Sequence, residues 1–397
     1  MGPVLFEHAE LLDPEGSASC AGSLLVDSGR ITARLRPDEP PPADARRIDL
    51  AGRALAPGFL DLHFHGEFVF APPARMPAVL ERTGNSLLAH GTTGYLVTSV
   101  AWPSAALAQF VTAIASAVGA GAAGAAPLGI HLEGPWVNPK AAGAQPREGI
   151  RSAGQQEIDD LLARAAGLIR MVTLAPEVDG SASLLSTLGR AGILPALGHS
   201  LADATAIDAA AGDGLRHVTH LFNAMGPLHH REPGVAGHVL ADDRLSCDII
   251  CDGVHVHRDM IVTAARAKRG RLALITDRIE LPQEDEAGEA LRGTSGSFDP
   301  STLEDDGVAL RLPSGRLAGS NLTLDRGLRN ICEMAAMTRL EAVAACTLLP
   351  ARLLGIEGER GTLRVGARAD FAVLDDESRV VETWLAGEKV YSRSPGA

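Results

Sequence analysis

The stretch that decides the fold is residues 54–65, ALAPGFLDLHFH, an apolar run that ends in two histidines, His63 and His65. Side chains on an extended strand alternate between two faces, so histidines two positions apart point to the same side. Imidazole is the commonest biological metal ligand, and a same-facing pair at a strand end supplies half of a metal site. Such pairs also arise by chance, so the meaning of this one depends on further ligands elsewhere in the chain.

Composition narrows the class of protein. The chain has 397 residues, 46% of them hydrophobic, and a net charge of −13. This length allows one large and one small globular domain, and the negative charge argues against nucleic acid or an anionic membrane as a partner. The sequence has no N-terminal signal pattern and no run of eighteen apolar residues, so we expect a cytoplasmic protein with no membrane association. Five cysteines without C-x-x-C spacing favour reduced thiols.

Short apolar runs alternate with amphipathic stretches through most of the chain. The predicted strands are 59–65, 93–99, 128–133, 171–175, 193–199, 217–222, 247–251 and 272–276. The predicted helices between them include 78–90, 104–118, 157–166 and 202–211. Eight strand–helix units favour an α/β fold of the (β/α)8 TIM barrel type over an open doubly wound sheet.

The two ends of the chain have a different pattern. Short β-like pieces separated by turn residues occur at 24–27, 30–35, 47–50, 361–363, 369–375, 380–385 and 388–391. We therefore predict that residues 1–57 and 350–397 pair into one small composite β-sandwich. Residues 58–349 then form the barrel domain.

Metal-binding and acid–base residues recur at the ends of the predicted strands. They are His63, His65, Glu133, His199, His220, His255 and Asp277. The active site of a barrel lies at the C-terminal ends of its strands, so these side chains should converge on one mouth. Any one of them could be a hydrogen-bonded core residue, but their recurrence at successive strand ends favours a shared site.

The residue types indicate metal-assisted hydrolysis. The imidazole and carboxylate groups of His63, His65, Glu133, His199 and His220 suit Zn²⁺ or Fe²⁺, one or two ions per subunit. Such an ion activates a water molecule for attack. A neighbouring carboxylate, for which Asp277 is the candidate as both ligand and base, accepts a proton and later delivers it to a leaving group.

Several longer strings carry a family resemblance. They are LGIHLEGP (128–135), LAPE (174–177), GHS (198–200), THLFNAM (219–225), REPG (231–234), DGVH (252–255) and LAGS (317–320). With the first-strand histidines they resemble the N-acetylglucosamine-6-phosphate deacetylase family of the amidohydrolase superfamily, over nearly the whole chain. The resemblance implies a TIM barrel with a composite β-sandwich. It also implies a metal-dependent enzyme that removes acetate from an N-acetylated amino-sugar phosphate, chiefly N-acetylglucosamine 6-phosphate.

The resemblance also implies roles for the catalytic residues. Glu133, His199 and His220 match the family's metal ligands, and the His63–His65 pair matches the ligands of a second ion in some members. Asp277 matches the catalytic acid and base.

Four further positions match residues that contact the substrate. His255 corresponds to a histidine that holds and polarises the acetamide carbonyl. Arg231, Asn223 and Ala224 correspond to positions that meet the sugar phosphate, and the planar guanidinium of arginine suits phosphate recognition. Because the matching arginine often comes from a neighbouring subunit, the resemblance implies a homodimer.

Three departures from the family pattern bear on the substrate. Gln145 stands where the family has a substrate-contacting histidine, and it can exchange hydrogen bonds but cannot carry a proton near neutral pH. Residues 66–70, GEFVF, replace a glycine-rich stretch. Arg278 follows the catalytic aspartate and leads into an acidic segment at 280–289, which either is a solvated face or covers the site.

Other functions remain as alternatives. A different N-acyl substrate is possible, such as N-acetylgalactosamine 6-phosphate, an unphosphorylated amino sugar or an N-acyl amino acid. A cyclic-amide hydrolase is disfavoured because its bridging lysine is missing near 171–177; the chain's lysines are Lys140, Lys268 and Lys389. A barrel that has lost catalysis would lack ligands that are present here, and no G-x-S-x-G elbow supports a serine nucleophile.

Overall fold

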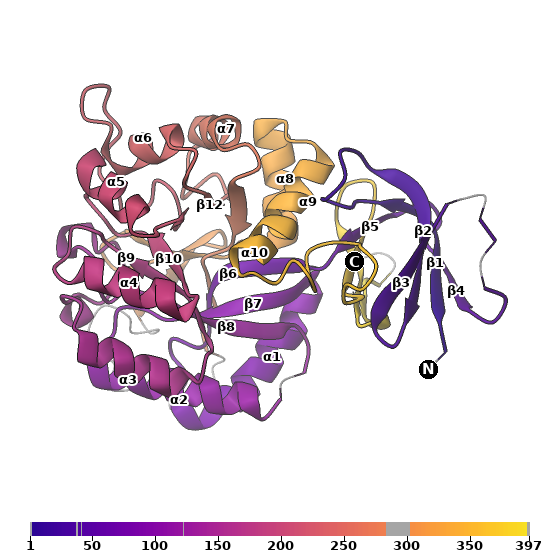
Figure 1. The fold of residues 1–397 in the computed structure, drawn as a ribbon, viewed down its shortest axis with the longest axis horizontal. Coiled ribbons are helices and arrows are strands. Elements are labelled where there is room, and N and C mark those ends of the chain that lie inside the picture. The colour runs from indigo at the N-terminus through magenta and orange to yellow at the C-terminus, as the bar shows by residue number, and fades with distance from the viewer. Residues whose placement is uncertain (1, 37–38, 41, 122, 283–301, 395–397) are drawn as a thin grey trace.

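The computed structural model describes residues 2–36, 39–40, 42–121, 123–282 and 302–394. The chain forms a large α/β body and a smaller β body beside it, and the first and last strands both belong to the smaller one (Figure 1). Within the described ranges, no helix has the length and apolar character needed to cross a bilayer.

The large body contains all eight predicted barrel strands. They are β6 (Phe59–Gly66), β7 (Thr92–Thr98), β8 (Ala126–Glu133), β9 (Ile169–Leu174), β10 (Leu194–Leu197), β11 (His217–Val218), β12 (Cys247–Ile250) and β13 (Leu272–Ile275). Strands β6 to β11 pair in parallel in chain order, and β12 pairs in parallel with β13. Contacts of β11 with β12 and of β13 with β6 bring the two arcs together, which confirms the predicted (β/α)8 architecture.

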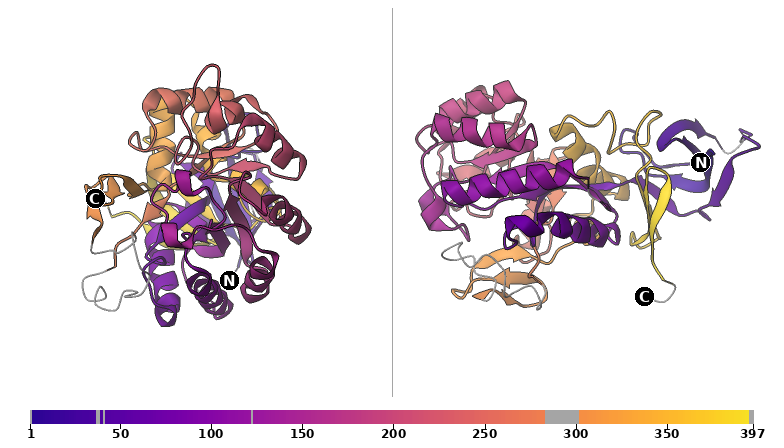
Figure 2. Two further views of the ribbon diagram at one scale, coloured as in Figure 1. Left: turned by 90° about the vertical axis from the view of Figure 1, so that its left-hand side faces the viewer. Right: turned by 90° about the horizontal axis from the view of Figure 1, so that it is seen from below.

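Helices surround these strands when the barrel is seen from its end (Figure 2). They are α1 (Met76–Leu88), α2 (Ser104–Gly119), α3 (Gln155–Ala165), α4 (Ser181–Ala191), α5 (Ala204–Gly212), α6 (Gly234–Ala241), α7 (Arg258–Ala267), α8 (Leu324–Ala335), α9 (Arg339–Cys346) and α10 (Leu348–Leu353). Helix α2 buries Leu107, Phe110, Val111 and Ile114, the i, i+3, i+4, i+7 stripe of an amphipathic helix. Because helices cover the outside of the strands, β6 and β7 are buried at every position.

The small body is one sheet made from both ends of the chain. Its strands are β1 (Val4–Leu11), β2 (Cys20–Asp27), β3 (Arg30–Leu35), β4 (Arg46–Asp49), β5 (Ala54–Pro57), β18 (Phe371–Leu374), β19 (Val380–Leu385) and β20 (Glu388–Ser392). The N- and C-terminal segments join where β18 pairs antiparallel with β5. Phe6 packs edge-on against Phe371 and Trp384 in the core of this sheet. The domain boundaries at 57/58 and 349/350 stay a prediction.

Two details of the small body differ from the sequence prediction. Strand β1 was not predicted, although it is the strand against which β2, β4 and β5 all pair. The predicted strand at 361–363 is wrong, because Gly361 has a φ of 80° and the segment turns instead of extending.

A small β insertion follows the last barrel strand. Strand β14 (Arg278–Ile279) lies between β6 and β17 (Leu317–Ser320), and β16 (Ala309–Arg311) and β15 (Glu304–Asp305) extend the sheet outward. These strands project to one side of the barrel (Figure 2). Most of the acidic segment at 280–289 lies outside the described residues, so the question of whether it covers the site is not tested.

A buried carboxylate links helix α8 to His90, which follows helix α1. Asp325 accepts hydrogen bonds from the Thr323 hydroxyl (2.6 Å) and from Arg329 (2.9 Å), and it pairs with His90 Nδ1 at 3.2 Å. Burial would raise the pKa of Asp325, but the bonds with His90, Thr323 and Arg329 outweigh it and hold the pKa well below 3.8.

Replacing Asp325 by asparagine should therefore lower the free energy of unfolding by about 2–3 kcal/mol at pH 7. A depressed carboxyl pKa contributes stability above the unfolded-state pKa, and this contribution is lost as the pH falls. The difference in melting temperature between Asp325→Asn and the wild-type chain should thus shrink below about pH 4. Differential scanning calorimetry across pH measures it, and a pH-independent difference would contradict this account.

Candidate metal centre and active site

Three predicted site residues lie just beyond the strands that were expected to contain or precede them. His199, His220 and Asp277 each follow the end of a strand (β10, β11 and β13) by two residues. Their φ angles are 48°, 35° and 50°, in the left-handed region that non-glycine residues rarely adopt. The predicted strands 193–199 and 217–222 are therefore too long, because this backbone turns each side chain out of the ladder. Such strained conformations are typical of functional sites.

Glu133 connects these residues into a first cluster. Its Oε1 lies 2.9 Å from His199 Nε2 and 2.8 Å from His220 Nε2. The two histidine Nε2 atoms are 3.1 Å apart, and all three side chains are buried. One carboxylate oxygen and two imidazole nitrogens thus converge within ligand distance of a single ion.

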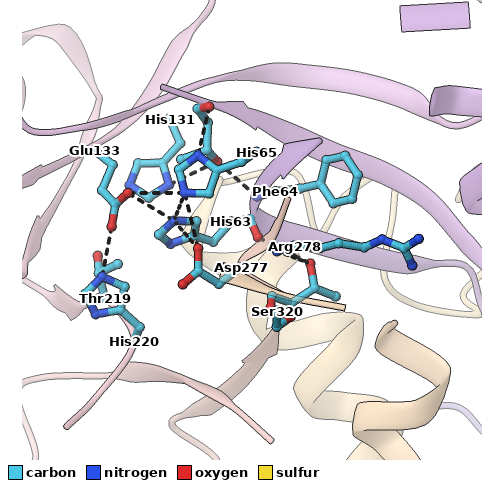
Figure 3. A network of polar contacts seen from close by, with 12 residues as sticks. His63, Phe64, His65, His131, Glu133, Thr219, His220, Asp277, Arg278 and Ser320 are labelled. Carbon is cyan, nitrogen blue, oxygen red and sulfur yellow. Dashed lines mark hydrogen bonds and ion pairs between the residues drawn. The ribbon is translucent and has the colours of Figure 1, made fainter. Parts of the chain in front are cut away.

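The strand-end pair His63 and His65 forms a second cluster against the other oxygen of Glu133. Oε2 lies 3.3 Å from His65 Nε2 and 3.5 Å from His63 Nε2. Asp277 Oδ1 lies 3.2 Å from His65 and 3.3 Å from His63, on the side away from Glu133 (Figure 3). Glu133 is therefore shared by both clusters, and Asp277 contacts the histidines of the second one.

The donor set fits a divalent cation. His199 Nδ1 donates to the Ala141 carbonyl (3.0 Å) and His65 Nδ1 to the Thr98 carbonyl (3.3 Å). In the neutral tautomer each Nε2 then carries a lone pair that faces Glu133, an arrangement of acceptors that needs a cation between them.

The pKa values of two clustered histidines also indicate a site that favours positive charge. Burial opposes protonation of His65 and His220, yet their hydrogen bonds to carboxylates outweigh it. The pKa of His65 rises to about 10 and that of His220 to about 9. Positive charge is thus strongly favoured here, and a proton can stand in for a metal ion.

Asp61 supports the second cluster and was missed as a site residue in the sequence. Its carboxylate accepts from the Thr276 hydroxyl at 2.6 Å and from the His63 backbone N–H at 3.2 Å, tying β6 to β13. Burial raises the pKa of Asp61 to about 6. The period-two pattern could have found it, because Asp61 precedes His63 by two positions on the same face.

His131, on β8, contacts the second cluster through its ring and is itself held by a hydrogen bond. Its Nε2 lies 2.7 Å from the Thr173 hydroxyl, which lies 2.7 Å from the Thr219 hydroxyl, and its ring packs edge-on against His63. Burial lowers the pKa of His131 well below 6.5, so the ring is neutral. This chain of contacts runs from β8 through β9 to the residue after β11, and no local sequence pattern indicates it.

The candidate substrate residues Asn223 and Ala224 lie in the turn directly after His220. Asn223 donates from its backbone N–H to the His220 carbonyl at 2.9 Å. Ala224 has a φ of 51° and lies beside Gly143, where an added Cβ would sit 3.4 Å from both Ala224 and the His199 ring. The 139–149 loop and the 222–226 turn are therefore neighbours beside His199.

The remaining candidates differ in what their side chains contact. His255 Nδ1 lies 2.6 Å from the Asp252 carboxylate, which leaves Nε2 as the ring nitrogen that can meet a ligand. Arg231 is exposed, and its guanidinium has no hydrogen-bond or ion-pair partner among the described residues. The Arg278 side chain points away from the cluster (Figure 3) and pairs with Glu280 at 3.1 Å.

Comparisons with known proteins agree with this geometry. The family model described as "Amidohydrolase family" matches residues 54–390. Human N-acetylglucosamine-6-phosphate deacetylase is 36% identical, with 93% of this chain and 91% of that protein covered. The chain belongs to the N-acetylglucosamine-6-phosphate deacetylase family of the amidohydrolases. This confirms the predicted family and an enzyme that acts on an amide.

Two further relatives bear on the substrate and the fold. N-acetylgalactosamine-6-phosphate deacetylase of Escherichia coli O157:H7 is 33% identical, with 88% of this chain and 90% of that protein covered. A mutant N-acetyl-D-glucosamine-6-phosphate deacetylase from Mycobacterium smegmatis, solved with N-acetyl-D-glucosamine-6-phosphate, is 31% identical with a TM-score of 0.86. That comparison covers 99% of this chain and 100% of the other. The roles of individual site residues stay predictions.

Proposed function

We propose that this enzyme hydrolyses the acetamido group of N-acetylglucosamine 6-phosphate, giving the amino-sugar phosphate and acetate. The observation that carries the proposal is the pair of histidine clusters joined by Glu133, with Asp277 beside them, at the mouth of an amidohydrolase barrel. Relatives that cover nearly the whole chain bear the name of this activity, which supports the choice of substrate.

The metal-binding residues are Glu133, His199 and His220, with His63 and His65 able to take a second ion. When bound, a divalent ion polarises the amide carbonyl and makes a water molecule more acidic. The imidazole and carboxylate donors suit Zn²⁺ or Fe²⁺. The rigid strand ends that carry the ligands hold them in place for this task.

Asp277 is the proposed acid and base. Burial would raise the pKa of Asp277, but the charges of His63 and His65 outweigh it and keep the pKa below 3.8. The carboxylate is therefore ionised at neutral pH and able to take a proton from the attacking water. It then delivers that proton to the departing amine nitrogen, which would otherwise leave as an unstable anion.

His255 is proposed to act on the acetamide carbonyl. The Asp252 carboxylate fixes the ring through Nδ1, and burial of Asp252 is outweighed by this bond so that the pKa of Asp252 stays below 3.8. With Nδ1 held by Asp252, Nε2 is the ring nitrogen available to donate a hydrogen bond to the carbonyl oxygen. Such a donor lowers the energy of the negative charge that develops on the carbonyl oxygen.

An acetate-release assay tests the proposed substrate. The purified enzyme, loaded with Zn²⁺ or Fe²⁺, is compared on N-acetylglucosamine 6-phosphate, its galactosamine isomer, N-acetylglucosamine and an N-acetyl amino acid. We expect the highest kcat/KM for N-acetylglucosamine 6-phosphate. A higher value for any of the other three compounds would overturn the substrate assignment while leaving amide hydrolysis intact.

Arg231 is proposed to bind the substrate phosphate, in a homodimer in which it reaches the neighbouring subunit's site. Its exposed guanidinium without a partner in the described chain is available for this contact. Replacing Arg231 by alanine should raise KM for the phosphorylated sugar about 10- to 100-fold, because a charged hydrogen bond is lost, with kcat less affected. Arg266→Ala, at an exposed arginine on α7, is the matched control. An unchanged KM in Arg231→Ala would contradict the role.

A further inference from the structure

Gln145 is held by hydrogen bonds at both ends of its side-chain amide. It lies in the loop between the short 3-10 helices Pro139–Ala141 and Arg147–Gly149, and only 6% of it is exposed. Its Oε1 accepts from the backbone N–H of Ala101 at 2.7 Å, and its Nε2 lies 2.6 Å from Glu133 Oε2. Because the Ala101 N–H can only donate, the carbonyl end of the amide must face it, and the NH₂ end therefore donates to Glu133.

This contact makes the two oxygens of Glu133 unequal. Oε1 faces only the ring nitrogens of His199 and His220 at ligand distance. Oε2 faces His63 and His65 and also accepts a hydrogen bond from the Gln145 NH₂ group. A hydrogen bond to a carboxylate oxygen draws electron density from it and uses one of its lone pairs. An ion held through Oε2 must therefore compete with the Gln145 donor, while an ion held through Oε1 does not.

The Gln145 NH₂ group also remains a hydrogen-bond donor to Glu133 across the neutral pH range. A glutamine amide does not lose its proton near neutral pH, and the Ala101 bond prevents the amide from rotating its oxygen toward Glu133. The fixed orientation also keeps Glu133 directed at His199 and His220. Residues that orient a metal ligand in this way commonly change metal affinity when they are removed.

We propose that Gln145 is a positioning residue that gives the two clusters different affinities for a metal ion. It makes Glu133–His199–His220 the site that fills first and weakens the site formed by His63 and His65. The enzyme is therefore biased toward a single ion at limiting metal. This inference rests on the proposed metal-dependent function, but it concerns the order and strength of metal binding and not the identity of the substrate.

Calorimetric titration of chelator-treated enzyme with Zn²⁺ tests the ranking directly. For the wild-type chain we expect one tight ion and a second whose Kd is at least about tenfold higher. Gln145→Glu keeps the length of the side chain and the bond from Ala101, but it replaces the donor with a second carboxylate oxygen. In this variant the second ion should bind at least about tenfold more tightly, so the two dissociation constants approach each other.

Gln145→Met serves as a second variant, since it keeps a similar length and loses both hydrogen bonds. Without its support Glu133 is free to rotate, and the first ion should bind about 10- to 100-fold more weakly. Gln109→Glu makes the same charge change at an exposed position on α2 and should leave both dissociation constants unaltered.

The outcomes separate this inference from the proposed function. Two equal sites in the wild-type chain, or an unchanged ratio of dissociation constants in Gln145→Glu, would overturn the role of Gln145 while acetate release could persist. A lower melting temperature of Gln145→Met with wild-type metal affinities would show a purely structural role and would also overturn it. Uptake of no ion by the wild-type chain would overturn the metal-dependent function and this inference together.

Discussion

Replacing Asp277 by asparagine should lower the rate of acetate release by about 10²–10⁴-fold, the usual contribution of a positioned acid and base. Asparagine keeps the volume of the side chain but cannot accept a proton from water or return one to the amine. Asp277 contacts His63 and His65, and within the described chain no hydrogen bond or ion pair joins it to His199 or His220, so the first cluster retains its ligands. The variant should therefore bind the first ion normally.

Two measurements check this expectation together. Acetate release reports catalysis, and elemental analysis of the purified variant reports its metal content. Asp376→Asn, at an exposed position in the small β body, is the matched control and should behave as the wild type. Retained acetate release in Asp277→Asn would exclude Asp277 as the acid and base. Loss of the first ion would show instead that Asp277 acts chiefly as a ligand.

Replacing Glu133 by glutamine should weaken binding at both clusters at once. Glu133 is the carboxylate that faces all four clustered histidines, through Oε1 on one side and Oε2 on the other. Glutamine presents one neutral oxygen, and its NH₂ group opposes both a cation and the Gln145 donor. We expect metal affinity to fall by more than about 100-fold, with activity falling in parallel.

Glu280→Gln provides the control for that variant. Glu280 is also largely buried near the barrel strands, but it pairs with Arg278 and contacts none of the clustered histidines. Burial raises the pKa of Glu280, so a neutral amide is tolerated more readily there than at Glu133. The metal content of Glu280→Gln should equal that of the wild type. If Glu133→Gln still bound one ion tightly, the shared role of Glu133 would be wrong.

Local pattern was enough to predict the barrel strands and the paired histidines. Strand β6 is a fully buried apolar run, and its period of two places His63 and His65 on one face. The helices between strands follow equally local rules, as the apolar stripe of α2 illustrates. Strand β1 was missed although its antiparallel partner β2 is the next strand along the chain, because an irregularity between Phe6 and Ala9, where His8 has a φ of 55°, interrupts the period-two alternation.

The backbone conformation of two site residues depends on hydrogen bonds to residues of neighbouring strands. His220 turns into the left-handed region where its N–H donates to Asp248, a residue of the next strand. Asp277 has a similar φ, and its backbone N–H donates to the His63 carbonyl on β6. Each strained turn is stabilised by a neighbouring strand, so the sequence around it reads as a simple continuation of the strand.

The sequence by itself determined the alternation of strands and helices, the ligand types at the strand ends and the family strings, because these follow from periodicity and residue chemistry. The tertiary structure decided that Glu133 is shared between two histidine clusters and that Gln145 donates to one of its oxygens. Those contacts join residues from several strands and one loop. Their geometry is set by how the strands close into a barrel, which no short stretch of sequence specifies.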